Sequence, residues 1–380
     1  MKNTIKHKLL ALCFFFFIVS LFAQKQNAIY PGQVWLDTNG KPIQAHGFSV
    51  FYKDGTYYWY GENKEFTKSG SNIWTYGIRC YTSQDFYNWE DKGLIIPPDT
   101  VNVLSPLHPS QQYDRPHIIF CAKTQKYVAW IKVMGASQSM TILEADKFMG
   151  PYKIVRQGYK PNGFESGDFD LYVDEESGKG YLWAERPHYE MICSTLSDDF
   201  TSVISEYSNH FVGILPPDTR EAPVHFIRKG KHYMFTSGTT SYYANPSLVS
   251  TFDDYHGEYT DLGNPHPEDS TNTSYCSQIT DVIKIPGKKD LYIAVADRWM
   301  PKSCGSDLFK RLSTIMRDMF KDSKPQERNF DQVAMVDKTT EKRTALDATK
   351  NARYVWLPIV WENDVPRIYW KDEWKLEDFE

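Results

Sequence analysis

Apolar and polar residues alternate along most of this chain in short runs that polar turns separate. One sequence pattern occurs five times. It consists of an alternating run, a turn and a second run rich in aromatic residues. The five copies are HGFSVFYKDGTYYWYGEN from His46, DRPHIIFCAKTQKYVAWIKV from Asp114, GDFDLYVDEESGKGYLWAER from Gly167, EAPVHFIRKGKHYMFTSG from Glu221 and SQITDVIKIPGKKDLYIAVADRW from Ser277. A period of two is typical of half-buried strands, and Asp-Gly, Lys-Gly or Ser-Gly favours tight turns, so each copy predicts a β-hairpin.

The hairpins begin at intervals of roughly 53 to 68 residues, which indicates an internal repeat. Further strand patterns follow the first and third hairpins, in IRCYTSQDFYNWEDKG and MICSTLSDDFTS. Five units of about four strands each predict an all-β chain folded as a five-bladed β-propeller. A late alternating segment, RYVWLPIVWENDVPRIYWKDEW, is expected to pair with the first blade and close the ring, because closure removes exposed sheet edges.

One segment, residues 302–350, departs from the strand pattern. Within it, SDLFKRLSTIMRDMFKDSK places apolar residues at helical spacing. They are Leu308, Leu312, Ile315, Met316, Met319 and Phe320. We predict a partly helical insertion whose amphipathic helix covers a blade edge, with Ser306 or Asp307 as the N-cap.

The N-terminal residues have the layout of a secretory signal peptide. A basic head precedes an apolar run from Leu9 to Phe22, and a small residue, Ala23, follows. The run is short for a membrane span, which needs roughly 20 residues. We therefore expect residues 1–23 to be a signal peptide cleaved near Ala23-Gln24. The mature chain, 24–380, would be a single propeller domain that is secreted or periplasmic and has no membrane span.

Charge and cysteine content exclude some functions. The formal net charge of −5 becomes −8 when the three lysines of residues 1–23 are removed. Such a chain lacks the basic surface that neutralises phosphates, so nucleic acid is not expected as a partner. The five cysteines beyond the signal are widely spaced without a C-x-x-C pair, which leaves a zinc site or a dense disulfide framework unsupported.

A polar residue stands at or near the start of every predicted inner strand. These residues are His46, Asp114, Asp168, Glu221 and Gln278. Because the first strand of each propeller blade lines the central channel, their side chains are expected to converge at one end of the axis. Glycoside hydrolysis requires such a set, since one group donates a proton and another activates water. Each acid alone is also a common residue before a strand, and this alternative stays open.

Several segments, taken in order, resemble glycoside hydrolase family 43. They are IQAHGFSVFYKDGTYYWYGENK, YTSQDFYNWEDKG, DRPHIIF, EAPVHFIRKGKHYMFTSGTT, SQITDV, ADRWMP and RYVWLPI. The resemblance extends from Ile29 to Trp374 outside the insertion, and it is closest to the branch of exo-acting β-1,3-galactanases. It implies a five-bladed propeller that hydrolyses glycosidic bonds with inversion at the anomeric carbon.

The resemblance also implies roles for individual residues. Glu221 matches the general acid, and Asp168 matches the aspartate that orients this acid and raises its pKa. The aspartate that serves as base in most of the family is absent, because its place reads Ala45-His46-Gly47. The galactanase branch shares this loss and is thought to use a glutamine, which Gln278 matches.

Asp114 stands where the galactanase branch has a glutamate. Its carboxylate lies roughly 1 to 1.5 Å short of the glutamate position, and misplacement on this scale costs about 10²-fold in rate. A neutral amide is a poor base, so Gln278 is expected to position water or to act as an imidic acid. Asp114 is the alternative proton acceptor.

Four further residues are expected to bind substrate: Glu62, Thr240, Trp299 and His46. For Glu62 a surface ion pair is the alternative, and for Thr240 and Trp299 it is packing in the core or at the rim. No cofactor or metal is required, although some members of the wider family carry a calcium ion on the axis. The expected partner is an oligosaccharide or polysaccharide, bound by a monomer.

The sequence thus favours a secreted, inverting exo-glycosidase acting on galactose-containing glycans such as the β-1,3-galactan of arabinogalactan. One alternative is an α-L-arabinofuranosidase or β-xylosidase of the same family. The other is a propeller that binds glycan without cleaving it. The missing family aspartate and the exchange at Asp114 motivate this last hypothesis, whereas the presence of Glu221 and Asp168 argues against it.

Overall fold

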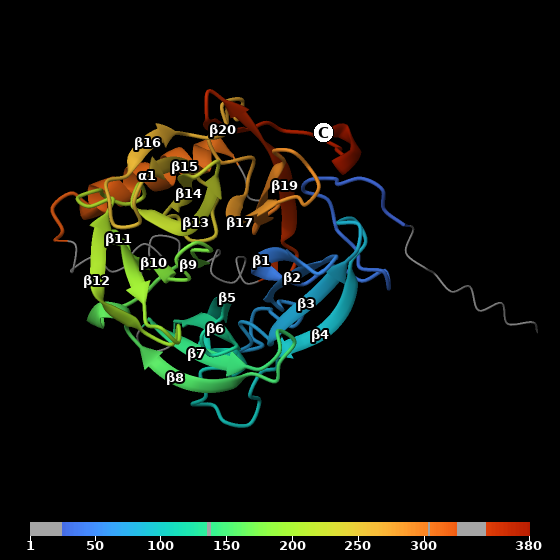
Figure 1. Cartoon of the computed structure of the whole chain (residues 1–380). Helices are drawn as coiled ribbons and strands as arrows, with labels where there is room; N and C mark the ends of the chain where they lie inside the picture. Colours follow the sequence, from blue (N-terminus) through green and yellow to red (C-terminus); the bar gives the residue numbers. More distant parts are fainter. Residues whose placement is uncertain (1–24, 135–137, 303–304, 325–346) are drawn as a thin grey trace, which may run out of the picture.

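The chain forms a ring of five blades. The structure is a computed structural model that describes residues 25–134, 138–302, 305–324 and 347–380. The described strands form five antiparallel sheets of four strands, arranged in chain order around a centre (Figure 1). The prediction of an all-β, five-bladed propeller is confirmed. The predicted signal peptide and residues 325–346 of the insertion lie outside the described residues.

Each blade is one continuous segment except the last. Blade one contains β1 (His46–Lys53), β2 (Thr56–Glu62), β3 (Ile78–Ser83) and β4 (Glu90–Ile96). Blade two contains β5 (Tyr113–Cys121), β6 (Lys126–Val133), β7 (Ser139–Ala145) and β8 (Lys153–Tyr159). Blade three contains β9 (Phe169–Val173), β10 (Gly180–Arg186), β11 (Glu190–Leu196) and β12 (Val203–His210). Blade four contains β13 (Arg220–Arg228), β14 (Lys231–Gly238), β15 (Leu248–Phe252) and β16 (Thr260–Gly263). Blade five contains β17 (Gln278–Lys284), β18 (Tyr292–Arg298), β19 (Arg353–Glu362) and β20 (Val365–Ile368).

The first strand of each blade faces the centre of the ring. The inner strands β1, β5, β9, β13 and β17 each contact the next, and β17 contacts β1, so the circle is complete. All five predicted hairpins are confirmed as the two innermost strands of a blade. Short 3-10 helices occur at Pro109–Gln111, Pro161–Gly163 and Leu376–Asp378.

Ring closure differs from the sequence-based expectation. The late segment from Arg353 does not pair with blade one, because β19 lies between β18 and β20 and supplies the third strand of blade five. The insertion between β18 and β19 delays the completion of that sheet in the sequence. The two ends of the described chain meet instead at an isolated bridge, in which the N–H of Ile29 donates to the carbonyl of Trp374 at 2.9 Å.

Aromatic packing joins the last blade to the first. Trp356 in β19 is fully buried, and its ring centroid lies 4.6 Å from that of Trp59 in β2. Trp35 and Trp89 approach the same ring, at 4.8 and 5.9 Å. The indole of Trp374 donates to the backbone carbonyl of Trp356 at 2.8 Å. Side-chain burial rather than strand pairing therefore holds these two blades together.

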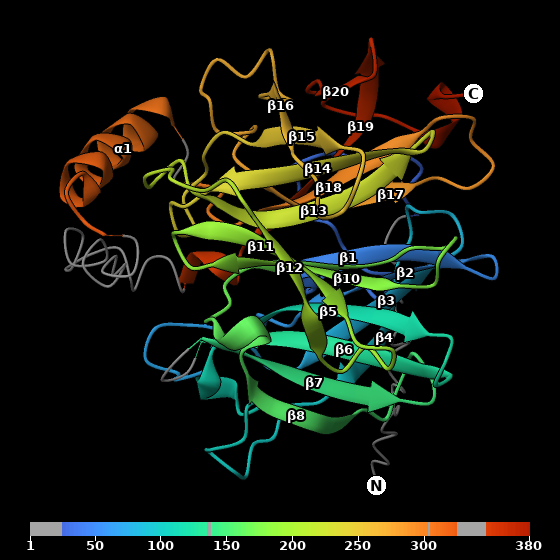
Figure 2. The same cartoon turned by 60° about the vertical axis from the view of Figure 1, so that its left-hand side comes forward.

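The helix predicted in the insertion is present as α1 (Ser306–Phe320), beside the sheets in Figure 2. Met316 and Phe320 on its predicted apolar face are each 1% exposed. Arg317 binds Asp218, just before β13, at 2.6 Å, which ties the helix to blade four. The N-cap prediction is wrong by one residue, because Gly305 in extended backbone precedes the helix and Ser306 is already helical.

Cysteines and hydropathy add little to the architecture. Cys80, Cys121 and Cys193 are buried free thiols, as expected for most of the set, and Cys276 is disulfide-bonded. Across the described ranges, none of the helices has the length and apolar character needed to cross a membrane.

Candidate active site

Three of the predicted polar residues lie at bulges near the starts of inner strands. The pairing register shifts just after His46 in β1, Asp114 in β5 and Glu221 in β13. The residue that follows each one has a positive φ: 50° at Gly47, 47° at Arg115 and 48° at Ala222. A bulge of this kind bends the strand and redirects the neighbouring side chain. Left-handed backbone at non-glycine residues is strained and is frequent at functional sites.

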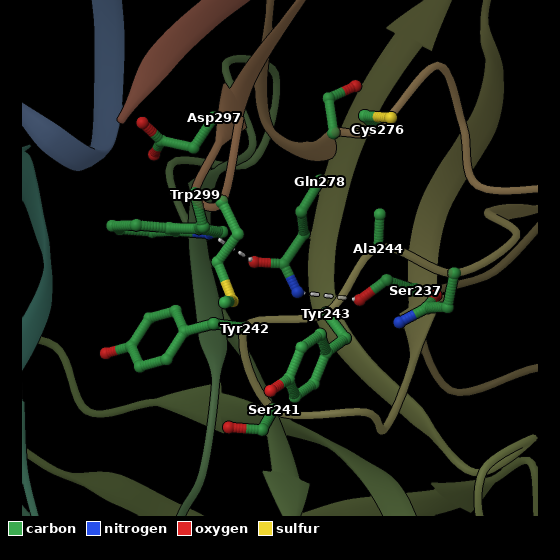
Figure 3. A pocket seen from close by; sticks show the side chains of 12 residues that line it. Ser237, Ser241, Tyr242, Tyr243, Ala244, Cys276, Gln278, Asp297 and Trp299 are labelled. Carbon is green, nitrogen blue, oxygen red and sulfur yellow. Dashed lines mark hydrogen bonds between the residues drawn. The ribbon is translucent and has the colours of Figure 1, made fainter. Parts of the chain in front are cut away.

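Glu221 and Gln278 are in direct contact. The Nε2 of Gln278 donates to Oε1 of Glu221 at 3.2 Å and to the Ser237 hydroxyl at 2.8 Å. Its Oε1 accepts from the indole of Trp299 at 3.2 Å and from the guanidinium of Arg115 (Figure 3 shows the bonds to Trp299 and Ser237). Arginine and tryptophan side chains can only donate, so the amide oxygen must face them and the amide orientation is fixed.

Asp168 is held by two cations. Its Oδ1 lies 2.8 Å from Nε of Arg115 and 2.7 Å from Nζ of Lys132. Burial on its own raises the pKa of a carboxyl, but the charges of Arg115 and Lys132 outweigh burial here. The pKa of Asp168 therefore lies below its ordinary value, and this side chain is an anion at neutral pH.

Glu221 has the opposite behaviour. Burial is the main cause that raises its pKa well above the ordinary value, and the negative charges of Asp168 and Glu185 add to it. Arg115 and Lys132 act in the other direction without cancelling these effects. Two neighbouring carboxyls thus have pKa values pushed apart, which is the arrangement that acid catalysis requires.

Glu185, at the end of β10, is a site residue that the sequence analysis missed. Its two oxygens accept the N–H groups of Asp168 at 3.3 Å and of His188 at 2.8 Å. Burial and the charge of Asp168 raise the pKa of Glu185 to about 7. Its carboxylate lies so close to Gly167 that a Cβ there would stand 2.1 Å from Oε2, so a larger residue at position 167 would displace the Glu185 carboxylate. The signal in the sequence was a charged pair, Glu185-Arg186, ending an apolar strand.

Asp114 and Glu62 form the other half of the cluster. Asp114 accepts a hydrogen bond from the indole of Trp74 and lies 3.7 Å from Lys64 and 3.6 Å from Lys132. Glu62 lies 2.7 Å from Nζ of Lys64, and burial together with the charge of Asp114 raises its pKa to about 7 in spite of that lysine. The surface ion pair considered for Glu62 is thus a buried one, since Glu62 is 1% exposed.

His46 and Thr240 face protein partners. His46 is completely buried, with Nδ1 at 2.9 Å from Asp297 and Nε2 at 3.3 Å from the hydroxyl of Tyr354. Thr240 donates to the carbonyl of Tyr243 at 2.6 Å within the connection between β14 and β15. Both side chains therefore support the walls of the site from behind.

An aromatic wall covers the charged cluster. Trp299 and Tyr242 line one pocket together with Gln278 and Ser237 (Figure 3). The ring of Tyr242 lies 5.3 Å from Trp299 and 5.9 Å from Trp74, centroid to centroid. Burial, with the charges of nearby carboxylates such as Asp114, raises the pKa of Tyr242 well above its ordinary value, so the phenol stays neutral. Tyr242 and Trp74 gave no signal in the sequence because they lie in loops.

The structure therefore brings together four of the five inner-strand residues. Arg115 contacts both Asp168 and Gln278, and Gln278 in turn donates to Glu221. Asp114 joins them through Lys132, which also binds Asp168. His46 is the exception, because it lies behind Trp299, with 5.7 Å between ring centroids. The bridging cations were missed in the sequence, although Arg115 stands directly after Asp114 in DRPHIIF.

Two further carboxyls on inner strands accept backbone N–H groups. Asp170 in β9 accepts the N–H of His225 at 2.7 Å, and Asp281 in β17 accepts the N–H of Val50 at 2.8 Å. Burial raises the pKa of Asp281 to about 7 and that of Asp170 well above its ordinary value. Over the residues that the structure describes, no three His, Cys, Asp or Glu side chains are grouped to hold a metal ion.

Comparisons with known proteins agree with this geometry. The family model described as "Glycosyl hydrolases family 43" matches residues 41–300. No curated protein gives a significant match to the sequence. Among solved structures, a β-1,3-galactosidase of family 43 is 28% identical with a TM-score of 0.73, over 93% of this chain and 65% of that protein. This chain thus spans just under two thirds of that relative.

Two other solved structures share the fold at lower identity. A second family 43 β-1,3-galactosidase, in complex with galactodeoxynojirimycin, is 24% identical with a TM-score of 0.71, over 92% of this chain and 100% of that one. An exo-β-1,3-galactanase from Phanerochaete chrysosporium, in complex with galactose, is 23% identical with a TM-score of 0.69, over 92% and 68% of the two chains.

Proposed function

The chain belongs to glycoside hydrolase family 43, and we propose that it is an exo-acting enzyme that releases galactose from β-1,3-linked galactan with inversion. The observation that carries the proposal is the neighbourhood of two carboxyls on adjacent inner strands whose pKa values move apart: that of buried Glu221 lies well above its ordinary value, and that of Asp168 lies below it. The names of the similar structures, β-1,3-galactosidases and an exo-β-1,3-galactanase, supply the choice of sugar and linkage.

Glu221 acts as the general acid. It gives its proton to the glycosidic oxygen while the bond from that oxygen to the anomeric carbon breaks. Burial and the negative charge of Asp168 raise the pKa of Glu221 and so favour its acid form, and Arg115 and Lys132 keep Asp168 ionised. Asp168 is therefore a positioning residue whose influence passes through Glu221.

Gln278 positions the reacting groups rather than accepting a proton. An imidic acid form would place a proton on the amide oxygen, but that oxygen already accepts from Trp299 and from Arg115, which carries a permanent positive charge. The amide nitrogen points to Glu221 at 3.2 Å. The glycosidic oxygen must come within hydrogen-bond reach of Glu221 to receive its proton, so the entering substrate displaces this amide from Glu221.

Asp114 accepts the proton of the attacking water. Its carboxyl group lies near Lys132, the cation that also binds Asp168, and the Trp74 indole and Lys64 lie against it. Water attacks the anomeric carbon on the face opposite the leaving oxygen, and one of its protons passes to Asp114. Glu62, next to Lys64, holds hydroxyl groups of the terminal sugar.

Trp299, Tyr242 and Trp74 provide the apolar wall for that sugar. Aromatic faces match the C–H face of a galactose ring, and the indole N–H groups of Trp299 and Trp74 point at Gln278 and Asp114. His46 and Thr240 support this wall through Asp297 and the 239–245 turn.

We further propose that the protein is exported and acts as a monomer without a cofactor. The proposal of export rests on the N-terminal sequence alone.

The test is incubation of the purified protein with β-1,3-galactan, followed by identification of the first sugar released. Galactose with the α configuration from the β-linked substrate is the expected product. Release of arabinose or xylose from arabinan or xylan fragments in place of galactose would redirect the assignment within the family. Binding of galactan without any product on long incubation would contradict the enzymatic proposal.

A further inference from the structure

A second pocket opens on blade three, beside the proposed acid. It is lined by Asn162 and Phe164 from the segment before β9, by Glu185 and Arg186 at the end of β10, and by Ser194 in β11. The strands β9 and β10 run antiparallel, with Ala184 paired to Phe169. The end of β10 therefore lies on the same face of the propeller as Asp168.

Glu185 joins this pocket to the active site. It lines the pocket, its Oε2 accepts the N–H of Asp168 at 3.3 Å, and its charge acts on Glu221. The pocket lined by Gln278 and Trp299 lies on blades four and five, and Glu221, at the start of blade four, stands in the ring order between Glu185 on blade three and Gln278 on blade five. A general acid protonates the oxygen between the retained sugar and the leaving group, so the two sugars must occupy opposite sides of it.

The chemistry of the blade-three pocket suits a sugar. The guanidinium of Arg186 is sandwiched between Phe164 and Tyr189, at 4.5 and 4.6 Å from the ring centroids. Its NH1 also binds Glu190 at 3.0 Å, while the side chain remains 31% exposed. A guanidinium held in this way loses little freedom when it donates to a hydroxyl. Half-buried Phe164 offers an aromatic face beside it.

We propose that the blade-three pocket is the leaving-group subsite, where Arg186 donates to the hydroxyls of the galactosyl unit that departs and Phe164 packs against its ring. This inference rests on the proposed galactanase function and adds the residues that recognise the polymer side of the scissile bond. With Arg186 and Phe164 in these roles, efficient cleavage would depend on a sugar, rather than any other leaving group, in this pocket.

The experiment compares two substrates with the same terminal galactose, β-1,3-galactotriose and an aryl β-galactoside, in the full-length protein and in Arg186→Ala. In Arg186→Ala, kcat/KM for galactotriose is expected to fall at least about tenfold further than kcat/KM for the aryl substrate. The reason is that the variant loses a hydrogen bond from a charged donor to the leaving sugar, and the aryl leaving group has no hydroxyl to accept that bond. Arg156→Ala, which removes an exposed arginine beside Tyr159 on the outer strand β8, is the matched control and leaves both values unchanged.

Phe164→Ala is the second variant. If circular dichroism shows that Arg186→Ala does not fold, the same comparison of the two substrates is made with Phe164→Ala. An equal loss on both substrates in the folded variant means a structural role and overturns the subsite. A wild-type protein that cleaves neither galactoside contradicts the proposed function itself. Wild-type cleavage of both, with no difference in the variants, contradicts only this inference.

Discussion

The ionisation of the site is decided by a few side chains that alternate in charge. Two cations that touch Asp168 lower its pKa, whereas burial and the charge of that neighbouring anion raise the pKa of Glu221. The same two cations, Arg115 and Lys132, also connect Gln278 and Asp114 to Asp168. Each residue therefore has a role that depends on the charge of its neighbour, and this gives two predictions.

The first prediction concerns Glu221→Gln. The variant retains the shape of the side chain but cannot give a proton, and general acid catalysis contributes about 10² to 10⁴ in rate. We expect kcat on β-1,3-galactobiose to fall by about that factor. Steady-state kinetics measure it, with Glu176→Gln in the exposed turn after β9 as the control. More than about a tenth of wild-type activity in Glu221→Gln would exclude Glu221 as the acid.

The second prediction concerns Asp168→Asn and pH. Removing the negative charge also leaves the positive charges of Arg115 and Lys132 less neutralised, and both changes lower the pKa of Glu221. Because activity is lost as pH rises through the pKa of the acid, the alkaline limb of the kcat/KM profile should move to lower pH. Glu185→Gln should move it in the same direction. An unchanged alkaline limb in both variants would show that these carboxyls do not tune the acid.

Among the elements, β19 has a structural role that its place in the sequence conceals. It completes blade five after the insertion, and its Trp356 packs against Trp35, Trp59 and Trp89 at the junction with blade one. The junction between blades five and one therefore depends on buried aromatic area, whereas pairing of the late segment with blade one was expected.

The third prediction follows from this packing. Trp356→Ala removes a fully buried side chain and leaves a large cavity, so the free energy of unfolding should fall by about 3 to 5 kcal/mol. Val360→Ala, on the same strand at a position that is 38% exposed, should change it by less than about 1 kcal/mol. Urea unfolding followed by tryptophan fluorescence measures both. Equal losses in the two variants would argue against the cluster as the closure.

At the scale of the whole molecule, burial raises the pKa of several carboxyl groups in spite of the cations nearby. Burial raises the pKa of Glu62, Glu185 and Asp281 to about 7, and it raises the pKa of Asp170 and of Glu221 well above their ordinary values. In the unfolded chain all five are ionised above pH 5. The folded protein therefore binds more protons than the unfolded chain near neutral pH.

The fourth prediction is that stability decreases between pH 7 and 9. Where the folded state binds more protons, the free energy of unfolding falls as pH rises. The histidines with lowered pKa, such as His117 at about 3, do not oppose this trend, because they are neutral in both states above pH 7. Urea midpoints at pH 7, 8 and 9 should decrease in that order. A urea midpoint that stays constant or rises with pH would mean that ionising these carboxyls does not lower the free energy of unfolding.

The repeat, the hairpins and most of the candidate site were readable in the sequence. Alternation and turn residues act locally, so five hairpins and the polar residue at the start of each inner strand follow from short segments such as EAPVHFIRKGKHYMFTSG. Ordered motifs also identified the family. The helix was predicted because its spacing is a local property too, although its N-cap was placed one residue late.

Only the tertiary structure decided how these parts act on one another. The pKa of Glu221, the orientation of the Gln278 amide and the burial of His46 depend on side chains from other blades, such as Arg115 and Asp297. Closure through Trp356 and the role of Glu185 likewise arise from contacts between segments far apart in the chain. A sequence specifies which groups are present and where each strand begins. The fold sets their distances and their exclusion from water, and these determine charge and therefore chemistry.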